Sequence, residues 1–150
     1  MGRRLRRKAI SGRLRTQDVS EGLELPALTK GPVRVRHLAM FAAATSEFAD
    51  IHYDRDYAHS MGLPDIIIQG FYKTATIAQM LKDWVGDGSA LRRLTVQHRG
   101  MDVAGNTLTA GGKVLKVSEE PDGKRVECEV WVDNQHGQRT ATGTAIIVLS

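Results

Sequence analysis

The chain has 150 residues, and its apolar and charged contents of 41% and 25% are average for a globular domain with a buried core. These values exclude fibrous and disordered classes, and no apolar run reaches the roughly 20 residues needed to span a bilayer. The net charge of +4 comes from seven basic residues among the first fifteen, without which residues 16–150 carry −3. The single cysteine, Cys128, cannot form an internal disulfide, which favours the reducing cytoplasm as the location.

This charge distribution divides the chain into a basic tail over residues 1–18, expected to be disordered, and one domain over residues 19–150. The tail lacks the apolar core of a secretory signal. Basic tails also occur in proteins that bind nucleic acid or anionic lipid. The simpler interpretation is a disordered arm, and we expect neither a nucleic acid nor a membrane as partner.

In the first half of the domain, the sequence predicts short helices and one short strand. Pro26 lies among the apolar residues of 16–31, which therefore indicate an edge strand and a loop. Residues 33–44 have near-helical apolar spacing. Asp54 is placed to cap a short helix over Arg55–Met61 that Gly62 ends, with Tyr57 and Ala58 facing inward.

The longest helical signal begins at Gly70, and Gly86 and Gly88 end it. Its apolar stripe is predicted to contain Phe71, Thr74, Ala78, Leu81 and Val85, whereas Thr76, Gln79 and Lys82 lie off the stripe.

After this helix the pattern changes to the period of two that is typical of strands. Leu94, Val96 and His98 alternate with polar residues, and a second strand is expected to have a bulge at Gly111-Gly112. Two further strands follow, the first with Val126, Cys128, Val130 and Val132 on one face and the second over Ala141–Leu149. A helix followed by four antiparallel strands in consecutive hairpins predicts an α+β fold with the helix on one sheet face.

Titratable residues are concentrated between the first helix and the long one, at Glu47, Asp50, His52 and Asp54. Glu47 and His52 are the candidate catalytic pair, because a carboxylate and an imidazole that converge on one water can move a proton from it. Asp50 and Asp54 are interpreted as caps or solvated charges. A third metal ligand at suitable spacing is missing, so we expect no metal.

The order of residues in FAAATSEFADIHYDRDYAHSMGLPDIIIQG (41–70) resembles the hydratase motif of the MaoC-like (R)-specific enoyl-CoA hydratases. The matching positions are Phe41, Thr45, Ser46, Glu47, Phe48, Ala49, Asp50, Ile51, His52 and Ala58. The resemblance covers roughly residues 33–150, and it implies the hot-dog fold, in which an antiparallel sheet wraps around a central helix. Glu47 stands where the family has Asp, Ala49 replaces Asn, Asp50 replaces Pro, and Gln69 replaces a usual His. This variant is similar to the small subunits of heteromeric steroid-side-chain enoyl-CoA hydratases.

The resemblance implies the addition of water to a trans-2-enoyl thioester of coenzyme A or a carrier protein, which gives a 3-hydroxyacyl thioester. Glu47 and His52 would be the acid and base, and the backbone N–H of Gly70 would hold the thioester oxygen. Gln69, Ile68 and Arg99 would contact the substrate. No cofactor is expected beyond the coenzyme A of the substrate. The expected assembly is a homodimer or a heteromer with a second MaoC-like chain.

Three alternatives remain open at this point. The departures from the motif fit a catalytically silent or supporting subunit of a heteromeric hydratase. A hot-dog thioesterase is a second alternative, although residues 71–80 offer no carboxylate to activate water. A nucleic-acid-associated protein that works through the tail is the third.

Overall fold

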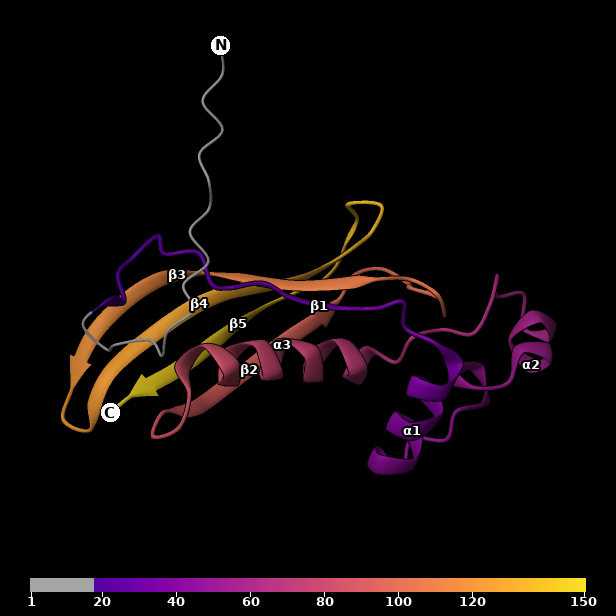
Figure 1. The fold of residues 1–150 in the computed structure, drawn as a ribbon, viewed down its shortest axis with the longest axis horizontal. Helices are drawn as coiled ribbons and strands as arrows, with labels where there is room; N and C mark the ends of the chain where they lie inside the picture. The colour runs from indigo at the N-terminus through magenta and orange to yellow at the C-terminus, as the bar shows by residue number, and fades with distance from the viewer. Residues whose placement is uncertain (1–17) are drawn as a thin grey trace, which may run out of the picture.

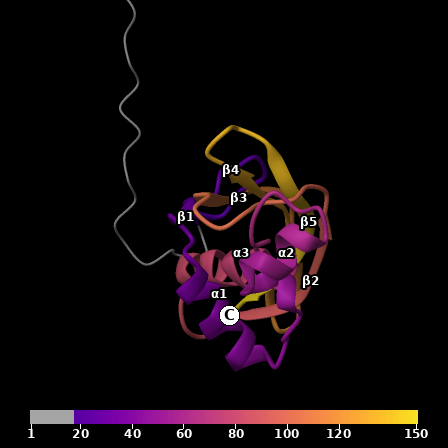
Figure 2. The same ribbon diagram turned by 90° about the vertical axis from the view of Figure 1, so that its right-hand side faces the viewer.

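A five-stranded antiparallel sheet curves around one long helix in the computed structural model, which describes residues 18–150 (Figure 1). The long helix is α3 (Gly70–Val85), and the strands are β1 (Leu28–Lys30), β2 (Ala90–His98), β3 (Leu108–Glu120), β4 (Gly123–Asn134) and β5 (Arg139–Leu149). In Figure 2 the sheet runs from β1 over α3 to β2 on the other side, so that it encloses the helix. The predicted α+β arrangement is confirmed. The predicted tail lies outside the described residues except for Asp18, and the domain boundary stays a prediction.

The strand order is β1-β3-β4-β5-β2, so the expectation that consecutive hairpins join the four strands after the helix is wrong for the first connection. β3, β4 and β5 are joined by hairpins, but β2 pairs with β5 at the opposite edge from β1. The segment between β2 and β3, residues 99–107, is too long for a tight hairpin. It pairs instead with the segment before α3, through a bridge between Ile67 and Val103.

β1 is an edge strand, as predicted, and Leu28 pairs with Ala110 of β3. The bulge in β3 lies between Val114 and Lys116 rather than at the two glycines. Gly111 and Gly112 pair regularly with β4, and their lack of a side chain serves close packing. A Cβ at Gly111 would lie 2.7 Å from Nε1 of Trp131, and one at Gly112 would lie 2.8 Å from a backbone oxygen.

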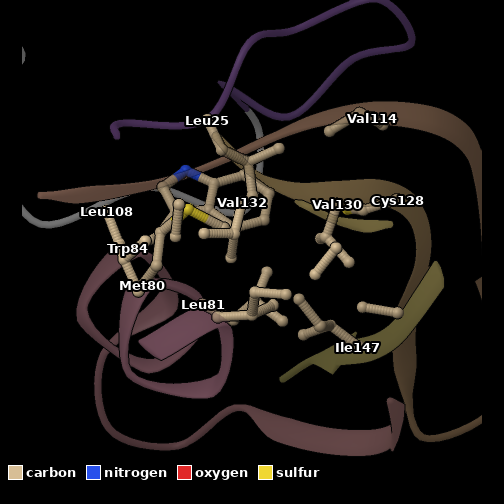
Figure 3. Close-up of a cluster of buried hydrophobic side chains, with 14 of the residues drawn as sticks. Leu25, Met80, Leu81, Trp84, Leu108, Val114, Cys128, Val130, Val132 and Ile147 are labelled. Carbon is tan, nitrogen blue, oxygen red and sulfur yellow. The ribbon is translucent and has the colours of Figure 1, made fainter. Parts of the chain in front are cut away.

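The hydrophobic core fills the space between α3 and the concave face of the sheet (Figure 3). The buried residues of α3 are Lys73, Thr76, Ile77, Met80, Leu81 and Trp84. The predicted stripe is therefore rotated from the observed one, and Phe71 is exposed. The prediction failed because the true core face contains two polar residues, Lys73 and Thr76, which interrupt its apolar pattern.

Three short helices form one end of the molecule, α1 (Val35–Thr45), the 3-10 helix η2 (Asp50–His52) and α2 (Arg55–Ser60). Oδ1 of Asp54 accepts a hydrogen bond from the Tyr57 N–H at 3.0 Å, so the predicted cap of α2 is confirmed. Ala58 is buried as expected, but Tyr57 is exposed. No helix within residues 18–150 is both long enough and apolar enough to cross a membrane.

Candidate active site

Glu47 follows α1 at a sharp change in chain direction. Ser46, which ends the helix, has a left-handed backbone conformation with φ 57°. The N–H of Glu47 reaches back to the Ala42 carbonyl at 3.1 Å. This turn presents the Glu47 carboxylate to η2 instead of continuing along the α1 axis.

His52 is the last residue of η2, and its side chain is largely buried. Nδ1 lies 2.7 Å from the Ile67 carbonyl oxygen. Because a carbonyl can only accept, Nδ1 must be the protonated nitrogen, and Nε2 of the neutral ring then has a free lone pair. Nε2 faces Glu47 and lies 3.6 Å from its Oε1. This distance is too long for a hydrogen bond, so the two groups do not bond to each other, and both can face one water molecule that lies beside them.

Glu47 is itself only partly satisfied. Its Oε2 atom is buried and has no hydrogen-bond partner within residues 18–150. A buried carboxylate oxygen without a donor is unfavourable. The carboxylate is therefore suited to accept a hydrogen bond from a bound water or substrate.

The segment that anchors His52 leads directly into α3. Gln69 is fully buried, and its Nε2 donates to the Leu38 carbonyl of α1 at 3.0 Å. Its Oε1 has no partner in the described part of the chain. Gly70 is the first residue of α3, and backbone N–H groups in the first turn of a helix have no partner within the helix and favour negative charge. Gln69 and Gly70 thus lie beside the segment that holds His52.

His98 also lies near the start of α3, a position that the sequence did not predict for it. A Cβ at Gly70 would lie only 2.9 Å from the imidazole of His98, so this ring packs directly against the start of α3. Partial burial, and then the charge of Lys73, lower the pKa of His98 below its ordinary value of 6.5. His98 alternates with Leu94 and Val96 along β2, which places the three on one face of the strand, and this alternation was the available signal.

The other proposed substrate contacts are less closely grouped. The Ile68 side chain is buried in the core, and its N–H donates to the Asp102 carbonyl at 2.9 Å. Arg99 is exposed and hydrogen-bonds to Gln97 on β2. Substrate contacts by Ile68, Gln69 and Arg99 stay predictions.

A buried ion pair near the site was also not anticipated. Nζ of Lys73 on α3 lies 2.6 Å from Oδ2 of Asp102, and both side chains are almost completely buried. Cys128, in contrast, belongs to the hydrophobic core and not to the site. It is buried in β4, and burial raises the pKa of its thiol to about 12.

Comparison with known proteins identifies the family of this chain and other structures with its fold. The family model for the MaoC like domain matches residues 22–141. The beta subunit of a 3-oxo-4,17-pregnadiene-20-carboxyl-CoA hydratase from Mycobacterium tuberculosis is 30% identical over 78 residues, which are 52% of this chain and 60% of that subunit. The match therefore spans less than two thirds of this relative.

Two solved structures share the fold. An (R)-hydratase from A. caviae involved in PHA biosynthesis has a TM-score of 0.80 at 21% identity, over 89% of this chain and 99% of that one. A chain of the ChsH1-ChsH2 complex from Mycobacterium tuberculosis has a TM-score of 0.78 at 24% identity, over 87% and 98%. The expected hot-dog fold is confirmed. Because the family model covers most of the chain, this protein belongs to the MaoC-like domain family.

Proposed function

We propose that this chain is a hydratase that adds water across the double bond of a trans-2-enoyl thioester of coenzyme A or a carrier protein. The observation that carries the proposal is the His52–Glu47 pair. Nε2 of His52 faces Oε1 of Glu47 at 3.6 Å, while Nδ1 is fixed by the Ile67 carbonyl. Membership of the MaoC-like family supports the same reaction class.

Hydration needs a base for water and a proton for the substrate. Nε2 of His52 takes a proton from a water that Glu47 orients, and the water oxygen bonds to C3 of the enoyl group. The electron pair of the double bond moves toward the thioester carbonyl. A proton returned to C2 from the His52–Glu47 pair completes the addition and restores both groups, so no cofactor is consumed.

The third requirement is to stabilise the negative charge that develops on the thioester oxygen. In this proposal the start of α3 provides this stabilisation, with Gly70 as the first helical residue. Donors aimed at developing charge in a site that excludes water contribute strongly to catalysis. Gln69, whose Oε1 is buried and unpartnered among residues 18–150, would contact the bound substrate or its water.

Spectroscopic assay of hydration tests the proposal, with short, long and steroid-like trans-2-enoyl-CoAs as substrates. His52→Ala and Glu47→Gln are each expected to lower kcat by about 10²–10⁴-fold, with little change in melting temperature. Glu47→Asp keeps the carboxylate and should lose less activity than Glu47→Gln. His59→Ala, an exposed histidine on α2, is the control and should keep wild-type activity.

We further propose that the active form contains two hot-dog chains, as a homodimer or with a second MaoC-like chain. Exposed apolar residues adjoin Glu47, Gly70 and Asp102 in the sequence, at Phe48, Phe71 and Met101, and Met40 is a further exposed apolar residue on α1. The relative from Mycobacterium tuberculosis is a beta subunit, and one structure with the same fold belongs to the ChsH1-ChsH2 complex, which supports such pairing. The buried free thiol of Cys128 fits a cytoplasmic location. If a heteromer retains full activity with His52→Ala in this chain, the active site belongs to the partner and this chain is a supporting subunit.

A further inference from the structure

The ion pair between Lys73 and Asp102 is the centre of a buried polar network. Besides Asp102, Nζ of Lys73 donates to the Gly100 carbonyl at 2.8 Å. Asp102 accepts from Oγ1 of Thr140 at 2.5 Å and from Nδ2 of Asn134 at 3.0 Å. The four side chains come from α3, the 99–107 segment, β4 and β5, and all are buried.

Stability alone gives no reason for this arrangement. Burial of two charges costs about as much as their attraction returns, and an apolar pair of similar volume often stabilises a protein equally well or better. The network instead fixes the position of the 99–107 segment. Gly100 and Asp102 of this segment can reach Lys73, Asn134 and Thr140 together in only one register. Two backbone bonds from Arg99 and Gly100 to the Thr140 carbonyl hold the same segment against β5.

The 99–107 segment in turn holds the segment before α3, whose Ile67 anchors His52. The Ile68 N–H donates to the Asp102 carbonyl at 2.9 Å, and the Ala104 N–H donates to the Ile66 carbonyl at 2.8 Å. On its other side, Ile67 donates to the Ile51 carbonyl at 2.9 Å and accepts from Nδ1 of His52. The path from the ion pair to the imidazole therefore consists of one short ladder.

The same segment also supports the helix that leads to Glu47. The Gly105 N–H donates to the Val33 carbonyl at 2.7 Å, and the Val33 N–H donates to the Asn106 carbonyl at 2.9 Å. Val33 lies two residues before α1, and Glu47 lies two residues after it. Both members of the His52–Glu47 pair are thus connected to the segment that Lys73 and Asp102 fix.

We propose that Lys73 and Asp102 are positioning residues, which hold the Ile67 carbonyl where it fixes the Nδ1–H tautomer of His52 and the approach of His52 to Glu47. This inference rests on the proposed function for its effect on catalysis. Its effect on the His52 tautomer is independent of any substrate. Neither residue is assigned a contact with the substrate.

The test uses the full chain and two variants. Lys73→Met keeps the stem and removes the charge, and Thr140→Val removes only one donor to Asp102. Imidazole ¹⁵N chemical shifts report the tautomer of His52. We expect both variants to increase the Nε2–H tautomer. Since a displacement of about 1 Å can cost 10²-fold in rate, Lys73→Met should lower kcat about 10- to 100-fold with a smaller change in KM, and Thr140→Val should lower it severalfold.

Ile147→Ala is the matched control for general destabilisation. It removes buried core atoms near the far end of β5 from Thr140, and it should lower the melting temperature while the His52 tautomer stays unchanged. If Lys73→Met and Thr140→Val melt early but keep the wild-type tautomer and kcat, the network is only structural and the inference is overturned. If the wild-type chain hydrates no enoyl thioester, the proposed function fails, while a tautomer change in the two variants still supports the positioning role.

Discussion

His52 is held by one backbone acceptor, and this contact determines which ring nitrogen can take a proton. Glu47 has no comparable support, since one of its oxygens is buried and unpartnered within residues 18–150. The two members of the pair therefore have different characters. The fold fixes the His52 ring through the Ile67 carbonyl, whereas the Glu47 carboxylate can still accept a hydrogen bond from water or substrate.

His98 is expected to make stability depend on pH. Its pKa is lowered in the folded protein by burial and by Lys73, so the unfolded chain binds more protons just below pH 6.5. The stabilisation is fully present above 6.5 and is lost as the pH falls toward the folded pKa. His98→Asn cannot titrate, so its melting temperature should fall less than that of the wild type between about pH 7.5 and pH 5. A wild-type slope in the variant would show that another group is responsible.

The sequence could predict individual site residues only where they belong to a local motif. Glu47 and His52 lie five positions apart, and the structure brings them together as expected. Lys73, His98 and Asp102 come from three separate segments, and their association depends on how the 99–107 segment crosses the fold. Their roles therefore required the tertiary structure.

At the scale of elements, the sequence predicted the helix cap and the strands. It did not predict the buried face of every helix. The Asp54 cap of α2 and the apolar face of β4 follow from local rules. The face of α3 was missed because Lys73, a charged residue, is buried there with Asp102 as its partner. The pairing of β2 with β5 was missed because sequence patterns do not specify which edge a strand joins.

The edge strand β2 depends on a glycine in its neighbour. A Cβ at Gly143 of β5 would lie 2.0 Å from the Thr95 carbonyl oxygen of β2. This contact is with backbone, so the two strands must separate to admit a side chain. We expect Gly143→Ala to lower the free energy of unfolding by about 1–3 kcal/mol, measured by urea denaturation.

The control for this change is Thr144→Ala, at the next position on the same strand. Thr144 is exposed, and surface substitutions usually change stability by no more than about 0.5 kcal/mol. Equal stability of the Gly143→Ala variant and the wild type would show that β2 can shift without cost.

At the scale of the whole molecule, the site lies at an end of the fold that has unusually apolar surroundings. Phe48 follows Glu47, Phe71 follows Gly70, and Met101 precedes Asp102, and all three apolar side chains are exposed. Exposed apolar surface of this kind marks a contact with a partner or a ligand. In addition, β2 is an edge strand, which has unpaired backbone groups along one side.

We therefore expect the chain to have about twice its mass of 16.5 kDa in solution, or to do so once a second MaoC-like chain is co-expressed. Light scattering coupled to size-exclusion chromatography measures this mass. Phe71→Ser should shift the equilibrium toward monomer without lowering the stability of the single chain, because Phe71 is exposed there and loses no core contact. Leu115→Ser is the matched control, since Leu115 is an exposed apolar residue on β3, away from the site. A monomer at micromolar concentration, both alone and with the second chain, would contradict the proposed pairing, and the apolar surface would then be assigned to the acyl group of the substrate.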